Sequence, residues 1–503
     1  MGLWAFMTAA LILLLILVVF CFLLYCGYIY YKHMKYDHIP GPPRDSFFFG
    51  HSPTIRKLMS NNLIMYDTFL EWVEKYGPVV RVNLSSTTIV FVASPEAVKK
   101  FLMSPKYTKD NFYECVETMF GVRYMGNGLL TDRDYEHWHK QRRIVDPAFS
   151  RNYLIGLMGM FNEVAEDLMD ILGDKADGKC QVGMHDMMGR VTLDVIAKAA
   201  FGMELNSLHD DQTPFTRAIT TVMKGMVEAR NPLVQYIPGK QAFIRDVKES
   251  LKFLRKTGQE CILQRRKAIQ DGEDIPMDIL TQILKGAETE SDCSLENLID
   301  NFVTFFIAGQ ETTANQLSFA VMELARHPEI LTRVQTEVDE VLGSKRDIEY
   351  EDLGKLQYLS QVLKETLRLY PVALGTSRAI EEEMVIEGVR VPPRTTIMFN
   401  SYIMGRMEKY YHDPLVFNPD RFHPDAPKSS YTYFPFSLGP RSCIGQVFAQ
   451  MESKVIMAKL LQRFEFEMVE GQSFRILDTG SLRPMDGVIC RLRPRAEHKS
   501  RKQ

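Results

Sequence analysis

The sequence predicts a mainly α-helical protein with a small β region, preceded by one transmembrane helix. Three observations predict this class: an uncharged apolar run at residues 3–31, helical periodicity through most of residues 152–339, and short strand-like stretches on either side of that region. The chain has 503 residues, of which 46% are hydrophobic, and a net charge of −3. This composition indicates a globular protein with a large core and excludes a disordered or nucleic-acid-binding chain.

The apolar run near the N-terminus predicts a membrane anchor. It is longer than the roughly 20 residues that a helix needs to cross a bilayer. Lys32, His33 and Lys35 follow it, which places the rest of the chain on the cytoplasmic side. A cleaved signal peptide is the alternative, but the run is too long and no basic residue precedes it. We expect an anchor at 1–31, a proline-rich linker at 32–47, a folded domain at 48–495 and a basic tail at 496–503.

The elements of the folded domain are expected in a mixed order. Prolines at 40, 42 and 43 cannot continue a helix, so the chain is expected to leave the anchor helix as a stiff, extended segment. The eight cysteines have no paired spacing, so neither a disulfide scaffold nor a zinc site is indicated, and a reducing compartment is expected. Helices are expected at 66–76, 95–102 and 447–464, and strands at 78–84, 88–92, 384–391 and 396–400.

The chain is expected to be organised around a cysteine loop at residues 436–445. Cys443 lies just before a predicted helix, whose positive end favours a deprotonated, metal-binding sulfur. Gly439 and Gly445 let the backbone approach a flat group, and Arg441 can meet an anion at its edge. Haem fits these three demands, with Cys443 as the ligand of the haem iron. The alternative is an ordinary buried cysteine in a tight turn.

A second stretch with unusual chemistry lies in a predicted helix at residues 301–315. Ala308 and Gly309 are followed by Glu311 and Thr312 in mid-helix, where Gly and Thr lower helix propensity. Over a haem, the small residues would leave room for oxygen and substrate, while the Thr312 hydroxyl and the Glu311 carboxylate could relay protons. Alternatively, Ala-Gly permits close helix packing and Thr312 bonds back to its own helix.

Two further pairs each share one helix face. Glu365 and Arg368 are three residues apart between apolar neighbours, so the pair is expected to be buried and to need a further partner. Trp138 and Arg142 are four residues apart in a basic stretch, which alone indicates a basic surface patch.

The spelling Phe436-x-x-Gly439-x-Arg441-x-Cys443-x-Gly445 resembles the haem-binding signature of the cytochromes P450. The other motifs stand in the order of this family and extend the resemblance over the whole chain. It implies the cytochrome P450 fold, a haem b cofactor and a haem-thiolate monooxygenase domain at 48–495. Arg421 would join the Glu365–Arg368 pair as a structural lock. By the same resemblance, haem propionates would be met by Trp138, Arg142, Arg378 and Arg441, and protons would be delivered by Thr312 and Glu311.

Within the family, the chain resembles the branch that carries out cholesterol 24-hydroxylation, at residues 39–44, 75–82, 197–204, 356–365 and 433–439. The departures are Gln310, Pro440, Leu374 and Ser377, and the last two leave the substrate and the attacked carbon open. The resemblance implies a sterol pocket lined by Tyr113, Val116, Met125, Leu130, Ile307, Ala308, Leu374 and Ser481.

The resemblance also implies partners and a location. Electrons would come from NADPH through NADPH-cytochrome P450 reductase, an acidic flavoprotein that suits the basic residues Lys140 and Arg143. The anchor would hold the enzyme in the endoplasmic reticulum membrane, with its catalytic domain in the cytosol. The alternatives are a monooxygenase of fatty acids or foreign compounds, a haem-thiolate isomerase, and a non-catalytic membrane-anchored lipid- or haem-binding protein. Retention of Thr312 disfavours the isomerase.

Overall fold

The computed structural model describes residues 2–210, 212–229, 231, 234–287, 294–427 and 429–495, and the predicted basic tail lies outside them. The α-helices are α1 (Gly2–Tyr36), α2 (Ser52–Ser60), α3 (Met65–Tyr76), α4 (Pro95–Leu102), α5 (Glu114–Glu117), α6 (Tyr135–Val145), α7 (Arg151–Ile155), α8 (Met158–Asp174), α9 (Met184–Phe201), α10 (Pro214–Ala229), α11 (Gln241–Asp271), α12 (Ile279–Ala287), α13 (Leu295–Arg326), α14 (Pro328–Leu342), α15 (Tyr350–Lys355), α16 (Gln357–Leu369), α17 (Ser401–Gly405) and α18 (Gln446–Arg463). Short 3₁₀ turns lie at Asn111–Tyr113, Asp146–Phe149, Val234–Tyr236 and Pro419–Phe422.

The strands are short and form small sheets. They are β1 (Val79–Leu84), β2 (Thr87–Val92), β3 (Thr118–Met119), β4 (Val122–Arg123), β5 (Val182–Gly183), β6 (Gly375–Ile380), β7 (Met384–Ile386), β8 (Val389–Val391), β9 (Thr395–Asn400), β10 (Phe464–Met468), β11 (Ile476–Asp478), β12 (Leu482–Pro484) and β13 (Ile489–Pro494). The largest sheet has the order β1-β2-β9-β6, in which β2 and β9 run parallel and the other neighbours antiparallel.

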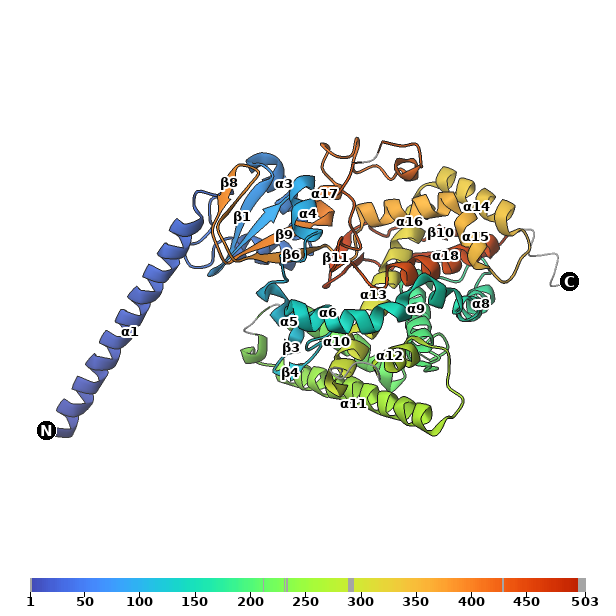
Figure 1. Cartoon of the computed structure of the whole chain (residues 1–503). Helices are drawn as coiled ribbons and strands as arrows, with labels where there is room; N and C mark the ends of the chain where they lie inside the picture. The colour runs from blue at the N-terminus through green and yellow to red at the C-terminus, as the bar shows by residue number, and fades with distance from the viewer. Residues whose placement is uncertain are drawn as a thin grey trace.

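The N-terminal helix α1 projects away from the rest of the molecule (Figure 1). Its apolar window has a mean hydropathy of 3.2, and none of it is buried. By length and composition this helix could cross a membrane. Its inner end contacts the folded body, because Lys35 Nζ donates to the carbonyl of Pro393, 2.8 Å away.

The body has a sheet end and a larger helical part, and α1 joins the sheet end (Figure 1). Each has its own apolar core: one cluster gathers around β1, β2 and β9, and a much larger one gathers around α8, α9, α13, α16 and α18. The prediction of a mainly helical protein with small β regions and one N-terminal apolar helix is therefore confirmed.

Helix α13 crosses the helical core and carries much of the candidate site. Ser294 caps its start, since the Ser294 side chain accepts a hydrogen bond from the backbone N–H of Asn297. Gln316 on α13 accepts a hydrogen bond from Ser453 on α18, 3.3 Å away. Helix α13, which contains Thr312, and helix α18, which follows the cysteine loop, are thus fixed to each other inside the core.

Candidate active site

The cysteine loop is closed by its own backbone. The N–H of Cys443 donates to the carbonyl of Phe436 at 2.8 Å, and the N–H of Ser442 donates to that of Gly439 at 3.0 Å. Gly439 has a φ of +70°, and a Cβ there would overlap the carbonyl oxygen of Leu102. Gly439 is therefore required by the approach of the loop to the end of α4, which differs from the expected reason. At Gly445 an added Cβ would come near the Cys443 sulfur, 3.9 Å away.

The protonation of Cys443 also differs from the expectation. Helix α18 begins at Gln446, and the sulfur is accessible although protein surrounds it. Burial raises the pKa of the Cys443 thiol, and this effect exceeds the opposing effects of the Gly445 backbone N–H, Arg142 and Lys109. Burial therefore outweighs the start of α18 in its effect on this thiol, and a bound metal ion, which deprotonates a coordinating thiol, would favour the thiolate.

Three cations gather at the loop: Lys109 and Arg378 are buried, and Arg441 of the loop is partly buried. Lys109, Arg378 and Arg441 repel one another, and burial together with the two arginines holds the pKa of Lys109 well below its usual range. Burial, with Arg378, lowers the pKa of Arg441 to about 10. Arg378 Nη2 and Arg441 Nε and Nη2 are buried and have no hydrogen-bond partner among the residues that the structure describes. Such donors need a hydrogen-bond acceptor, and neighbouring cations favour an acceptor that is anionic.

The cations are held by several ordinary contacts. Arg441 Nη1 donates to the carbonyl of Asp132 at 2.8 Å, and its guanidinium lies 3.8 Å from the centre of the Trp138 ring. Arg378 Nη1 donates to Thr376 Oγ1 at 2.7 Å, and Lys109 Nζ donates to the carbonyl of Leu130. Sequence reasoning missed Lys109, because a lysine in a loop before any motif carries no signal of its own.

Arg142 contacts the cysteine loop from its backbone side. Its Nη1 donates to the carbonyl of Ser442 at 2.8 Å, and its Nε lies 2.6 Å from Asp146. Trp138 is almost fully buried on the same helix, α6. The predicted contact of both side chains with a propionate stays a prediction.

The middle of α13 stays accessible although the helix is buried on both sides of it. Residues 308–312 are partly exposed, between buried stretches at 301–307 and 313–324. Gly309 is itself partly exposed, but a Cβ added there would lie 2.8 Å from Ile196 of α9. Thr312 Oγ1 donates to the carbonyl of Ala308 at 2.7 Å. Close helix packing at Gly309 and back-bonding by Thr312, the alternatives raised from the sequence, are therefore both present.

Glu311 binds a residue that was expected to line the substrate pocket. Ser481 Oγ donates to Glu311 Oε1 at 2.7 Å. The other predicted wall residues differ in how far they are buried. Met125 and Ile307 lie in the core and Leu130 is exposed. The partly buried ones are Tyr113, Val116, Ala308 and Leu374. Tyr113 hydrogen-bonds Thr376, 3.1 Å away. Ser377 is buried and donates to Asp110, so it faces the interior of the sheet end.

The Glu365–Arg368 pair is fully buried and has the expected third member. Arg368 Nε and Nη2 each lie 2.7 Å from a Glu365 oxygen, and Arg421 Nε lies 3.3 Å from Glu365 Oε1. Arg421 also donates to the carbonyls of His412 and Asp413, so the cluster ties α16 to the segment before the cysteine loop.

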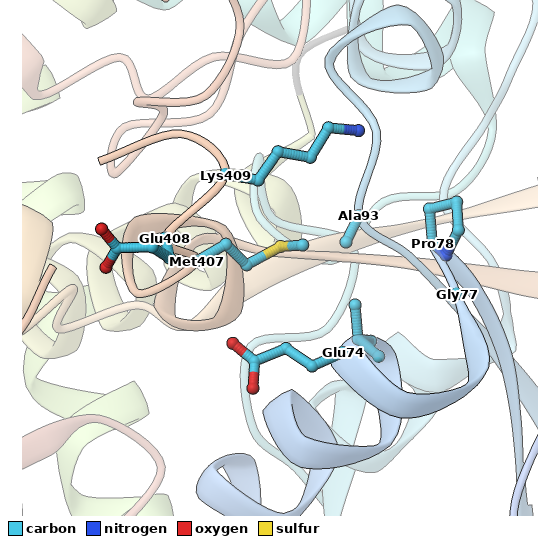
Figure 2. A pocket seen from close by; sticks show the side chains of 8 residues that line it. Glu74, Gly77, Pro78, Ala93, Met407, Glu408 and Lys409 are labelled. Atoms are coloured by element: carbon cyan, nitrogen blue, oxygen red, sulfur yellow. The ribbon is translucent and has the colours of Figure 1, made fainter. Parts of the chain in front are cut away.

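A surface hollow of about 350 Å³ lies elsewhere, at the sheet end (Figure 2). Its lining residues are Val73, Glu74, Gly77, Pro78, Ala93, Met407, Glu408 and Lys409. None of the side chains predicted for the site contributes to it, so it is separate from the cysteine loop.

Comparison with known proteins fits this arrangement. Residues 40–491 match the family described as Cytochrome P450. The chain is 29% identical to Cytochrome P450 4d2 of Drosophila melanogaster, over 86% of this chain and 92% of that protein. It is 28% identical to Cytochrome P450 3A11 of Mus musculus, over 85% and 86%, and 27% identical to Cytochrome P450 3A5 of Homo sapiens, over 90% and 91%. With nearly its whole folded body matched, the chain belongs to the cytochrome P450 family and is a monooxygenase of that family.

Proposed function

We propose that this monooxygenase hydroxylates a sterol, and specifically the cholesterol side chain at carbon 24. Because the chain belongs to a family of monooxygenases, the alternative of a non-catalytic binding protein is excluded. The sterol depends on the sequence resemblance and on the mostly apolar character of the expected walls, which suits a large hydrocarbon body with one hydroxyl. The relatives named above support the class and do not select a substrate.

The observation that carries the cofactor assignment is the cation cluster next to Cys443. Family membership implies haem, and the residues present fit it. The unpartnered nitrogens of Arg378 and Arg441, together with the Lys109 amine, suit two propionates, and the accessible Cys443 sulfur suits the iron. When bound, haem supplies the iron centre at which molecular oxygen is activated for insertion into a C–H bond.

Thr312 and Glu311 are proposed to handle the protons of the reaction. The Thr312 hydroxyl rotates from the Ala308 carbonyl toward the accessible face of α13, where it holds a proton. Glu311 exchanges protons from the neighbouring helix position. A side chain positioned for general acid–base chemistry contributes about 10²–10⁴-fold in rate, so this pair suits a reaction that consumes protons at a dry site.

We further propose the surroundings in which this enzyme works. Electrons come from NADPH through a flavoprotein reductase, which docks on the exposed basic residues Lys140 and Arg143 of the α6 region. Helix α1 anchors the chain in the endoplasmic reticulum membrane, and the domain at 48–495 lies in the cytosol. Helix α1 continues to Tyr36, so only residues 37–47 of the predicted linker follow it, and this segment sets the orientation of the domain to the bilayer.

One experiment tests the substrate. Purified protein is incubated with reductase, NADPH and a panel of sterols and fatty acids, and products are identified by mass spectrometry. We expect a side-chain hydroxysterol as the main product. Oxidation of fatty acids or foreign compounds alone would overturn the sterol assignment and favour the alternative substrates. Leu374 favours these alternatives, because the resemblance implies a large aromatic residue at this position and leucine leaves more room in the pocket.

A further inference from the structure

A hydrogen-bond chain runs from the start of α9 to Glu311. His185 Nε2 lies 2.9 Å from Asn315 Oδ1, Asn315 Nδ2 donates to Ser481 Oγ at 2.9 Å, and Ser481 Oγ donates to Glu311 Oε1 at 2.7 Å. The chain joins α9, α13 and the turn between β11 and β12, which are far apart in the sequence. The sequence analysis assigned no role to His185 or Asn315, and it expected Ser481 only as a wall of the substrate pocket.

The Glu311 carboxylate at the end of this chain determines which group donates and which accepts in every hydrogen bond. An ionised carboxylate only accepts hydrogen bonds, so the Ser481 hydroxyl must be the donor in its hydrogen bond to Glu311. Its oxygen then accepts from the Asn315 amide, whose carbonyl oxygen is left to accept from the His185 Nε2–H. A hydrogen-bond chain with all donors pointing toward Glu311 stabilises negative charge on that carboxylate.

The groups around His185 favour its neutral form, in which it can donate one hydrogen bond to Asn315. Burial lowers the pKa of His185, and Arg483 adds to this effect, while the Asn315 hydrogen bond, Glu311 and Asp186 oppose it. The imidazole is therefore neutral near pH 7, with one N–H to donate. It is partly exposed, so the chain begins near solvent.

The chain is the main polar support of Glu311. Asn315 and Ser481 are 1% and 6% exposed, so bulk water does not replace them as partners. Asn315 Nδ2 also approaches Glu311 Oε1 at 3.3 Å. Among the described ranges of the chain, no Lys, Arg or His forms an ion pair with Glu311. The hydrogen-bond partners of Glu311 are therefore neutral donors.

We infer that Ser481 is a positioning residue for Glu311, and that Asn315 and His185 hold the Ser481 hydroxyl in the required direction. The inference rests on the proposed role of Glu311. In the coupled reaction, a substrate C–H, O₂, two electrons from NADPH and two protons give C–OH and water. The Glu311 carboxylate takes up a proton from solvent and gives it up at the accessible face of α13. It then accepts the Ser481 hydrogen bond again as a carboxylate. When the reaction is uncoupled from substrate oxidation, O₂, two electrons and two protons form H₂O₂.

The test compares Ser481→Ala with Ser481→Thr in the haem-loaded enzyme with reductase and NADPH. The substrate is whichever sterol or fatty acid of the panel the wild type oxidises fastest. We expect Ser481→Ala to lower the ratio of product to H₂O₂ on the order of tenfold, as for the loss of one hydrogen bond to a charged group. The solvent deuterium isotope effect on product formation should rise. Ser481→Thr keeps a hydroxyl and should restore both values.

The matched control is Ser318→Ala. Ser318 is a buried serine on α13 that donates to the Ala314 carbonyl of its own helix. We expect it to leave the product ratio and the isotope effect at wild-type values. A Ser481→Ala enzyme with wild-type values of both would overturn the inference. If the wild type oxidises only fatty acids, the sterol proposal fails, whereas Ser481 is still tested on that fatty acid.

A second readout does not depend on activity. Thermal unfolding of Ser481→Ala, Glu311→Gln and the double variant forms a double-mutant cycle. We expect non-additive shifts in Tm for this pair and additive shifts for Ser318→Ala with Glu311→Gln. Additive shifts at Ser481 would overturn the contact. Non-additive shifts with an unchanged product ratio would assign Ser481 a structural role only, which also overturns the inference.

Discussion

The Arg441 guanidinium lies 3.8 Å from the centre of the Trp138 ring, while its Nε and Nη2 have no hydrogen-bond partner among the described residues. The ring holds one face of the guanidinium, and the Asp132 carbonyl holds Nη1. The remaining edge is left to a ligand. With Arg378 and Lys109 nearby, this edge suits an anion, as proposed above for a haem propionate, and the three cations repel one another.

This repulsion predicts a pH dependence of the cofactor-free protein. The pKa of Lys109 in the folded state lies well below 10.5, its usual value. Between these two values the unfolded state binds more protons, so the free energy of unfolding rises with pH and levels off above about 10.5. Lys109→Met should flatten this rise, as measured by urea unfolding across the pH range. A rise that persists unchanged in the variant would contradict the assignment.

Cofactor retention should depend on the same cluster. Arg441→Met removes the two unpartnered nitrogens of that side chain, so haem should dissociate more readily, as measured by transfer to an excess of apomyoglobin. Arg143→Met, an exposed position on α6, is the control and should retain haem like the wild type.

The sulfur ligand gives a spectroscopic prediction. Cys443→Ala should abolish the thiolate signature in the carbon-monoxide difference spectrum of the reduced protein, because no other cysteine lies in the loop. Cys115→Ala, at an exposed position, should leave the spectrum unchanged. A Cys443→Ala protein that keeps the signature would remove this residue as the ligand.

The buried acid of the Glu365 cluster gives a stability prediction. Glu365→Gln leaves Arg368, which is 2% exposed, without its counter-charge. Breaking a buried ion pair from one side costs about 3–5 kcal/mol, so we expect a loss of that order in the free energy of unfolding. Glu408→Gln, at an exposed carboxylate paired with His412, should change stability little. Chemical denaturation followed by circular dichroism makes the comparison.

The anchor is tested by truncation. Without residues 2–27, the protein should lose membrane association in sedimentation assays and keep its folded domain, since this part of α1 lies almost entirely outside the body. Continued sedimentation with membranes would place a second attachment site on the body.

The sequence predicted the elements better than their contacts. The uncharged apolar run was sufficient to predict α1, and apolar periodicity was sufficient to predict α3, α4 and α18, because periodicity follows from local spacing. The predicted helix at 447–464 and the observed Gln446–Arg463 differ by one residue at each end. Lys109 and the support of Glu311 by Ser481 could not be predicted, because both depend on segments brought together only by the fold.

The motifs also carried less information on geometry than on chemistry. Gly439 was expected to make room for a ligand, but its space is taken by the Leu102 carbonyl. Gly309 was expected at the accessible face, but it faces Ile196. A glycine in a sequence indicates a close approach without naming the partner, and in both cases the partner is this chain itself.

The fit of Gly439 against Leu102 has a consequence for biosynthesis. The loop with the cysteine leaves the ribosome late, and it reaches its final shape only against a segment made more than three hundred residues earlier. A haem site at Cys443 would therefore form only after the cysteine loop has been made and has met Leu102.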